Sequence, residues 1–178
     1  MVSRVAAQTL HNDIDNSHRL ALLRGRTNSS EGGVFAKTHQ RYLDVLIPAH
    51  RKALTRLMFS EHPLAVEQLR RATRYHRAFE RHERICRLCH GEVEDEMHII
   101  STCSGNQDLL LLRTEMIRQL NRFMPHLPPL AEDARTIREI IAGPPDAIAA
   151  LARFVHRAFQ VVSSVPMLLP GSTCVYPE

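Results

Sequence analysis

The sequence of 178 residues contains no tryptophan, six phenylalanines, three tyrosines and four cysteines. Because aromatic residues are so few, several of them must fill the core, which limits how many can serve a binding surface. Four cysteines in a chain of this length, with no apolar stretch behind a basic N-terminus, argue against a secreted protein built on disulfides. No apolar stretch approaches the roughly 20 residues that span a bilayer. These absences predict a soluble protein of the nucleus or cytoplasm, with no membrane partner.

The signatures of several enzyme classes are also missing. The chain has no Gly-rich phosphate loop, no internal repeat and no extended alternation of apolar and polar residues. It lacks the adjacent aspartates that hold magnesium in a polymerase palm. Its scattered carboxylates offer no obvious nucleophile or general base. We therefore expect a protein that is not an enzyme.

Charge is unevenly distributed, although the net charge is only +4. From Arg51 to Arg87, ten basic and four acidic residues give +6, whereas Leu88 to Gln107 holds four acidic residues and no basic one, giving −4. Of the 23 basic residues, 21 are arginine. A guanidinium fork matches phosphate geometry, which favours a nucleic-acid partner. The alternative is that these arginines only keep helical faces hydrated.

Apolar residues recur at helical spacing along most of the chain. One amphipathic pattern runs from Val2 to about Leu23, and the polar stretch TNSSEGG at 27–33 then predicts a flexible break. Further helices are expected on both sides of Pro63, over 109–124 and 137–141, and from Asp146 to about Val162. The pattern indicates an all-α, irregular multi-helix domain.

Three of the four cysteines lie within 18 positions, in the segment RICRLCHGEVEDEMHIISTCS. Cys86, Cys89, His98 and Cys103 form the pattern C-x2-C-x8-H-x4-C, and two cysteines three positions apart can turn both sulfurs toward one point, as in a zinc knuckle. Gly91 can adopt the positive φ of a tight return. The acidic run at 92–96 favours the start of a short helix, which Gly105 would end. A zinc ion held by four protein ligands is structural rather than catalytic.

Other assignments remain open for this segment. His90 directly follows Cys89 and His82 lies four residues before Cys86, so either could replace His98, although neither spans the loop that a clip must close. Without a metal, the segment would hold three reduced core cysteines and a surface histidine. Cys174 is an unrelated thiol. We divide the chain into an N-terminal helix and flexible break (1–33), a helical basic leader (34–84), a zinc clip (85–105) and a C-terminal helical region (106–178).

The stretch from about Arg41 to Cys103, about a third of the chain, resembles the C-terminal tail of reverse transcriptases from non-LTR retrotransposons, especially fungal ones. Such tails carry the motif L-T-R-L-x-x-x-x-H-x-L-A-V-E-x-L-R, a basic stretch, a C-x2-C pair, V-E-D-E-x-H and a final cysteine. The matching residues here are Leu54, Thr55, Arg56, Leu57, His62, Leu64, Ala65, Val66, Glu67, Leu69 and Arg70, then Cys86, Cys89, Val93, Glu94, Asp95, Glu96, His98 and Cys103.

The resemblance covers the tail alone. The polymerase motif is absent, and so is a legible sheet for the ribonuclease H carboxylates that often precede such tails. The resemblance therefore implies a remnant or free-standing tail, and tails of this family are thought to grip template RNA or target DNA.

Two functions follow from these observations. The first is a non-catalytic, zinc-binding module for RNA or single-stranded DNA, in which arginines contact phosphates and rings such as Tyr75, His76 and Phe79 stack on bases. Its alternative is that the arginines pair with Glu67, Glu80, Glu83 and the acidic run. The second function is a zinc-stapled scaffold that binds a protein partner. The candidate nucleic-acid contacts are Arg70, Arg71, Arg74, Tyr75, Arg77, Arg81, Arg84 and Arg87.

Overall fold

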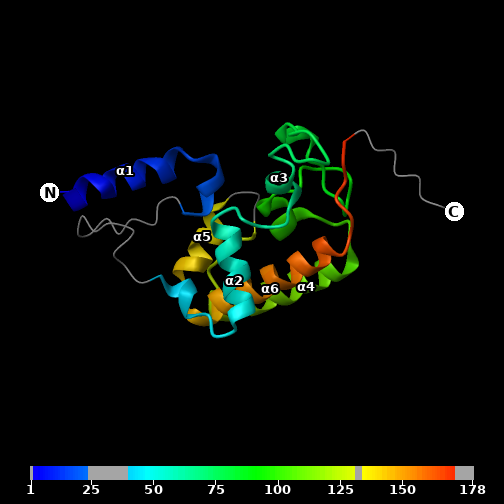
Figure 1. Cartoon of the computed structure of the whole chain (residues 1–178). Coiled ribbons are helices and arrows are strands. Elements are labelled where there is room, and N and C mark those ends of the chain that lie inside the picture. Colours follow the sequence, from blue (N-terminus) through cyan, green and yellow to red (C-terminus); the bar gives the residue numbers. More distant parts are fainter. Residues whose placement is uncertain (1, 24–39, 131–133, 171–178) are drawn as a thin grey trace.

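The computed structural model describes residues 2–23, 40–130 and 134–170 (Figure 1). Within these ranges the chain forms helices and irregular segments, and the predicted all-α class is confirmed. In these ranges an isolated antiparallel β-bridge pairs Ile85 with Val93. The predicted break at 27–33 and the thiol of Cys174 lie outside the described residues. None of the helices in the described ranges is long and apolar enough to cross a lipid bilayer.

The core is built around α6 (Pro145–Ser163), which contacts α2 (Pro48–Met58), α4 (Gln107–Phe123) and α5 (Ala134–Ala142). Four alanines lie on its buried face and allow neighbouring helices to approach closely. Pro145 and Pro48 occupy the first helical turns, where a missing N–H costs nothing. At α4 the Asn106 side chain caps the helix by accepting from the Leu109 N–H at 3.0 Å. The predicted helical stripes over 109–124 and 146–162 are confirmed.

The N-terminal amphipathic pattern divides into two elements. Helix α1 covers Val2–Asn16, and a 3-10 segment, η1 (His18–Leu23), follows with a kink at Leu20. In Figure 1, α1 extends away from the bundle, and its buried residue Ile14 lies near its C-terminal end. The amphipathic pattern predicted from Val2 to about Leu23 is thus interrupted by a kink, and the chain turns to bury Leu22 and Leu23 in the core.

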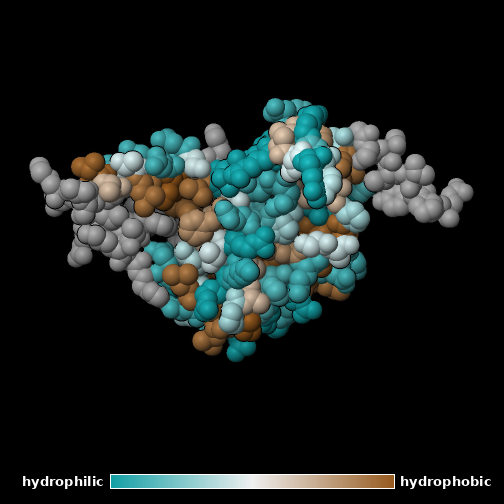
Figure 2. Space-filling model, in the orientation of Figure 1, coloured by the Kyte–Doolittle hydropathy of each residue, from teal (hydrophilic) through white to brown (hydrophobic). Residues whose placement is uncertain are grey.

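The basic leader is less helical than its sequence predicts. After the short η3 (Arg41–Asp44) and α2, helix is limited to α3 (Ala65–Gln68) and to η4 (Arg81–Glu83). Residues 69–80 form no helix, so the arginines in this stretch lie on an irregular loop. On the face shown in Figure 2, hydrophilic side chains cover the region of α2 and α3. The hydrophobic core takes residues from all four segments of our division, so these segments share one core.

Candidate metal centre

The structure brings the four predicted donors together. The ligand atoms of Cys86, Cys89, His98 and Cys103 all lie within 4.8 Å of one another. Sγ of Cys86 is 3.7 Å from Sγ of Cys103, close to the roughly 3.8 Å edge of a tetrahedron with Zn–S bonds of about 2.3 Å. Sγ of Cys89 lies 3.2 Å from Nε2 of His98. Three sulfurs and one imidazole suit zinc, so the group could hold such an ion.

A tight turn joins the first two donors. The His90 N–H donates to the Cys86 carbonyl at 2.9 Å, and the Cys86 N–H donates to the Glu92 carbonyl at 2.7 Å. The residue with positive φ in this turn is His90, at 60°. The expectation that Gly91 adopts this conformation is therefore wrong, because the return is made one residue earlier.

The two competing histidines lie apart from the donor group. Nε2 of His90 is 3.1 Å from the Arg87 carbonyl oxygen, which fixes its ring outside the cluster. His82 is exposed on η4. Among the described residues, neither histidine belongs to the group of donors. Nδ1 of His98 instead lies 3.1 Å from Oγ1 of Thr102, a contact that orients the imidazole with Nε2 toward the sulfurs.

His98 and Cys103 are placed by a π-helical turn, η5 (His98–Thr102), with Cys103 immediately after it. Ile99 and Ile100 pack into the core, as the sequence predicts. The guanidinium of Arg113 on α4 is buried beneath this turn and donates to the carbonyls of Ile100 at 2.9 Å, Ile99 at 3.0 Å and Cys103 at 2.8 Å. Arg113 thus satisfies the last carbonyls of the ligand turn, a role that its place in an amphipathic helix did not indicate.

Gly105 has a different role from the one its position suggests. A Cβ atom there would overlap the backbone carbonyl of Leu88 and the amide nitrogen of Cys89. The chain after the last donor therefore runs directly against the backbone of the Cys86–Cys89 turn, which only glycine allows. This close approach holds the two halves of the clip together.

Protonation of the donors is coupled. The hydrogen bond with Cys103, together with burial, raises the pKa of Cys86 to about 12, and the same hydrogen bond lowers the pKa of Cys103. Burial disfavours a charged His98, but its interactions with Cys86 and Cys89 outweigh burial and raise its pKa to about 9. A divalent cation would displace these protons, because it binds thiolates and neutral imidazole.

The acidic run connects this centre to the rest of the molecule. Glu94 is fully buried and accepts from the Ala65 N–H at 2.8 Å and the Arg87 N–H at 2.9 Å. Glu96 lies 2.7 Å from Nε2 of buried His62, and this contact outweighs burial and lowers the pKa of the Glu96 carboxyl. Asp95 caps the ligand turn by accepting from the His98 N–H at 2.9 Å. The sequence predicts that the whole acidic run favours the start of the helix, but of these residues Asp95 is the one that caps it.

Two of the predicted nucleic-acid contacts donate to backbone carbonyls of the fold. The Arg87 side chain is 5 % exposed, pairs with Glu94 at 2.8 Å and donates to the carbonyls of Pro63 and Val165. Arg84 donates to the carbonyls of Phe79 and Val66 at 2.7 and 2.8 Å. Both guanidinium groups donate to carbonyls of the fold around the clip. The assignment of buried Arg87 to a binding surface is therefore wrong, whereas Arg84 is half-buried and its assignment stays a prediction.

The other candidates remain at the surface with varied partners. Arg77 pairs with Glu83 at 2.6 Å and Arg81 with Asp95 at 2.6 Å, yet their side chains are 61 % and 62 % exposed. Arg70 pairs with Glu67, whereas Arg71 and Arg74 form no ion pair with any described residue. The alternative that the arginines neutralise the carboxylates thus holds for part of the run.

The aromatic candidates separate in the same way. Phe79 is buried in a small cluster with Ala65 and Leu69, so it cannot stack on a base. Tyr75 is 74 % exposed, and the Arg74 guanidinium lies 4.6 Å from the centroid of its ring.

Comparison with protein-family models, curated proteins and solved structures finds no match for this chain. The resemblance to reverse transcriptase tails therefore stays a prediction from the motifs.

Proposed function

We propose that this protein is a non-catalytic module that binds single-stranded nucleic acid, preferably RNA. Binding uses the irregular loop 69–80, here called the arginine loop, which a structural zinc site holds in place. The observation that carries this proposal is the exposed ring of Tyr75, which lies against Arg74 on a loop that is anchored at its base. Exposed aromatic rings beside arginines are stacking platforms for unpaired bases.

The loop has a fixed base and a free tip. At its base, the Phe79 N–H donates to the Leu69 carbonyl at 3.0 Å, and the Phe79 side chain is buried. Near its tip, the Thr73 N–H donates to the His76 carbonyl at 2.8 Å, and Oγ1 of Thr73 accepts from the Tyr75 N–H at 3.2 Å. A ring presented from such a turn loses little conformational freedom on binding, which favours affinity.

The metal centre supports this loop and leaves no position for catalysis. All four donors come from the protein, and a zinc ion held in this way has no open position for a water or substrate. The Glu94 carboxylate of the clip accepts from the Ala65 N–H, the first N–H of α3. Arg81 pairs with Asp95 of the clip. The zinc would thus fix the segment that precedes the arginine loop.

The likeness of residues 41–103 to retrotransposon reverse transcriptase tails supports the same function. The geometry of the clip agrees with the motif, since the three matching cysteines and His98 contribute to one donor group. Glu94 and His62, which also match, are fully buried and hold the clip to α3 and α6. We infer that the chain is a free-standing or remnant tail of this kind.

The proposal is tested by fluorescence anisotropy with labelled single-stranded RNA, single-stranded DNA and duplex DNA over a series of salt concentrations. If the five surface arginines contact phosphates, the log–log slope of affinity against salt is about −3 to −4 for a single strand. Tyr75→Ser should weaken RNA binding roughly fivefold to tenfold, whereas Arg122→Gln on α4 should leave it within about twofold. A flat salt profile and an unaffected Tyr75→Ser variant would refute the proposal.

One observation favours the second function, a zinc-stapled scaffold for a protein partner. Leu111 and Ile117 on α4 are 59 % and 37 % exposed, whereas Leu109, Met116 and Leu120 of the same helix are buried. Capture of a partner that survives nuclease treatment and is lost in Leu111→Glu would favour the scaffold. Loss of the partner after nuclease treatment would favour nucleic-acid binding.

A further inference from the structure

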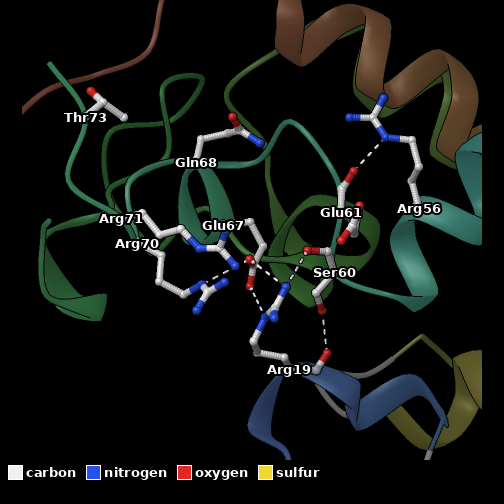
Figure 3. A pocket seen from close by; sticks show the side chains of 9 residues that line it. All are labelled: Arg19, Arg56, Ser60, Glu61, Glu67, Gln68, Arg70, Arg71 and Thr73. Atoms are coloured by element: carbon white, nitrogen blue, oxygen red, sulfur yellow. Dashed lines mark hydrogen bonds and ion pairs between the residues drawn. The ribbon is translucent and has the colours of Figure 1, made fainter. Parts of the chain in front are cut away.

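A polar hollow of about 400 Å³ lies between η1, the end of α2 and α3 (Figure 3). Every side chain that lines it is polar or charged, which suits a polar or charged ligand rather than an apolar one. Four of the side chains are arginines that come from separate parts of the chain. The lining residues are Arg19, Arg56, Ser60, Glu61, Glu67, Gln68, Arg70, Arg71 and Thr73.

The hollow carries excess positive charge. Four arginines face two glutamates, which leaves +2. Glu67 lies between two guanidinium groups, accepting from Nε and Nη2 of Arg19 at 3.1 Å and from Nε of Arg70 at 3.1 Å. One carboxylate cannot neutralise two guanidinium groups, so this pair keeps a net charge of about +1.

The remaining two arginines have no carboxylate partner among the described residues. Nε of Arg56 donates to the backbone carbonyl of Glu61 at 2.6 Å, which leaves its charge uncompensated. Arg71 makes no hydrogen bond to the described part of the chain, and Figure 3 shows it beside Arg70 on the same side of the hollow. Guanidinium groups free on one edge are suited to bidentate contact with phosphate oxygens.

We propose that this hollow holds one backbone phosphate of the bound strand. Arg71 contacts its oxygens from the side where Glu67 positions Arg19 and Arg70, and Arg56 contacts them from across the hollow (Figure 3). Thr73 connects the hollow to the stacking ring, because its hydroxyl accepts from the Tyr75 N–H. This inference rests on the proposed function for the identity of the strand, and it adds Arg19 and Arg56, which lie outside the arginine run.

A hydrogen-bonded pair that involves neither contact arginine joins two walls of the site, although Arg56 also donates to the Glu61 carbonyl. The Ser60 hydroxyl donates to the Arg19 carbonyl, and Nη2 of Arg19 donates to the Ser60 carbonyl at 3.2 Å. Since this reciprocal pair joins η1 to the end of α2, substitutions at Arg56 and Arg71 should leave the walls in place. The matched control is Arg122, an exposed arginine of α4 that forms no ion pair with a described residue and does not line the hollow.

The experiment has two arms on the full chain. In the first, inorganic phosphate is titrated into ¹⁵N-labelled protein, and the arginine Nε–H signals are followed by NMR. In the second, the affinity for labelled single-stranded RNA is measured for Arg56→Gln, Arg71→Gln and Arg122→Gln. We expect losses of roughly fivefold to tenfold for the first two variants and less than about twofold for the control.

A variant that gains affinity guards against misfolding. Glu67→Gln removes the carboxylate that competes with phosphate and should tighten RNA binding about threefold, whereas Glu115→Gln, which makes the same charge change on α4, should not. RNA binding with equal losses in all three arginine variants and no gain in Glu67→Gln would overturn the hollow and keep the proposed function. Phosphate-induced shifts at these arginines without RNA binding would keep the anion site and overturn the strand as its ligand.

Discussion

Arg113 offers the sharpest test of how the metal centre is built. Its guanidinium donates to three carbonyls at the end of the ligand turn, those of Ile99, Ile100 and Cys103, at 2.8 to 3.0 Å. Burial lowers the pKa of Arg113, because a charged guanidinium is costly to keep away from water, and its three hydrogen bonds offset this cost. We consider Arg113→Met, which keeps most of the volume and removes every donor.

The magnitude follows from the three bonds. A hydrogen bond in a folded protein contributes about 0.5 to 1.5 kcal/mol, and the saved desolvation of the charge offsets part of the sum, so we expect the free energy of unfolding to fall by about 2 kcal/mol. Because the same bonds orient Cys103 and the His98 turn, zinc affinity should fall roughly tenfold to a hundredfold.

The assays are urea denaturation of the zinc-loaded protein and competition with a chromophoric zinc chelator. Arg118→Met on the same helix is the control, because its side chain is 68 % exposed and pairs with exposed Glu115. A stability within about 0.5 kcal/mol of the native protein, together with zinc affinity within about twofold, would refute the role assigned to Arg113.

Two further changes test the fold around the centre. Gly105→Ala should destabilise the protein by about 2 to 3 kcal/mol in urea denaturation, since its Cβ would overlap the Leu88 backbone. Gly91→Ala should change stability little, because the nearest atom to its Cβ would be the Cys89 carbonyl oxygen at 4.0 Å. Equal effects of the two substitutions would contradict the close approach at Gly105. Burial and positive neighbours lower the pKa of His50 from 6.5, so protonation of His50 opposes folding and stability is lost as pH falls below about 6.5. The His50→Gln variant should therefore lose less stability than the native protein between about pH 7 and pH 5. An unchanged pH profile of stability would contradict this. The charged neighbours of His50 are His156, Arg153 and Arg157 on α6.

The sequence predicts those features that depend on local spacing. The donor pattern of Cys86, Cys89, His98 and Cys103 is local, since a clip of 18 residues leaves few ways to bring four ligands together. The stripes that became α4 and α6 are also local, because an apolar face at helical spacing has to be buried. These features could be derived without knowing what lies across the core.

Tertiary partners could not be derived in the same way. Arg87 lies 75 residues from Val162, to whose carbonyl it donates, and Arg19 lies 48 residues from Glu67. The sequence alone does not distinguish an arginine that is buried in the fold from one that is free to contact a phosphate. The close approach of Gly105 to Leu88 is likewise invisible until the chain is folded.

The central claim is that Cys86, Cys89, His98 and Cys103 bind one zinc ion that holds the fold together. The most direct measurement is metal analysis of protein purified without added zinc, combined with circular dichroism before and after removal of the metal by a chelator. We expect about one zinc per chain and a loss of cooperative unfolding when the zinc is removed. The Cys86→Ser variant should bind no zinc and should show no cooperative unfolding. Protein that carries no zinc and unfolds identically with and without chelator would contradict the central claim.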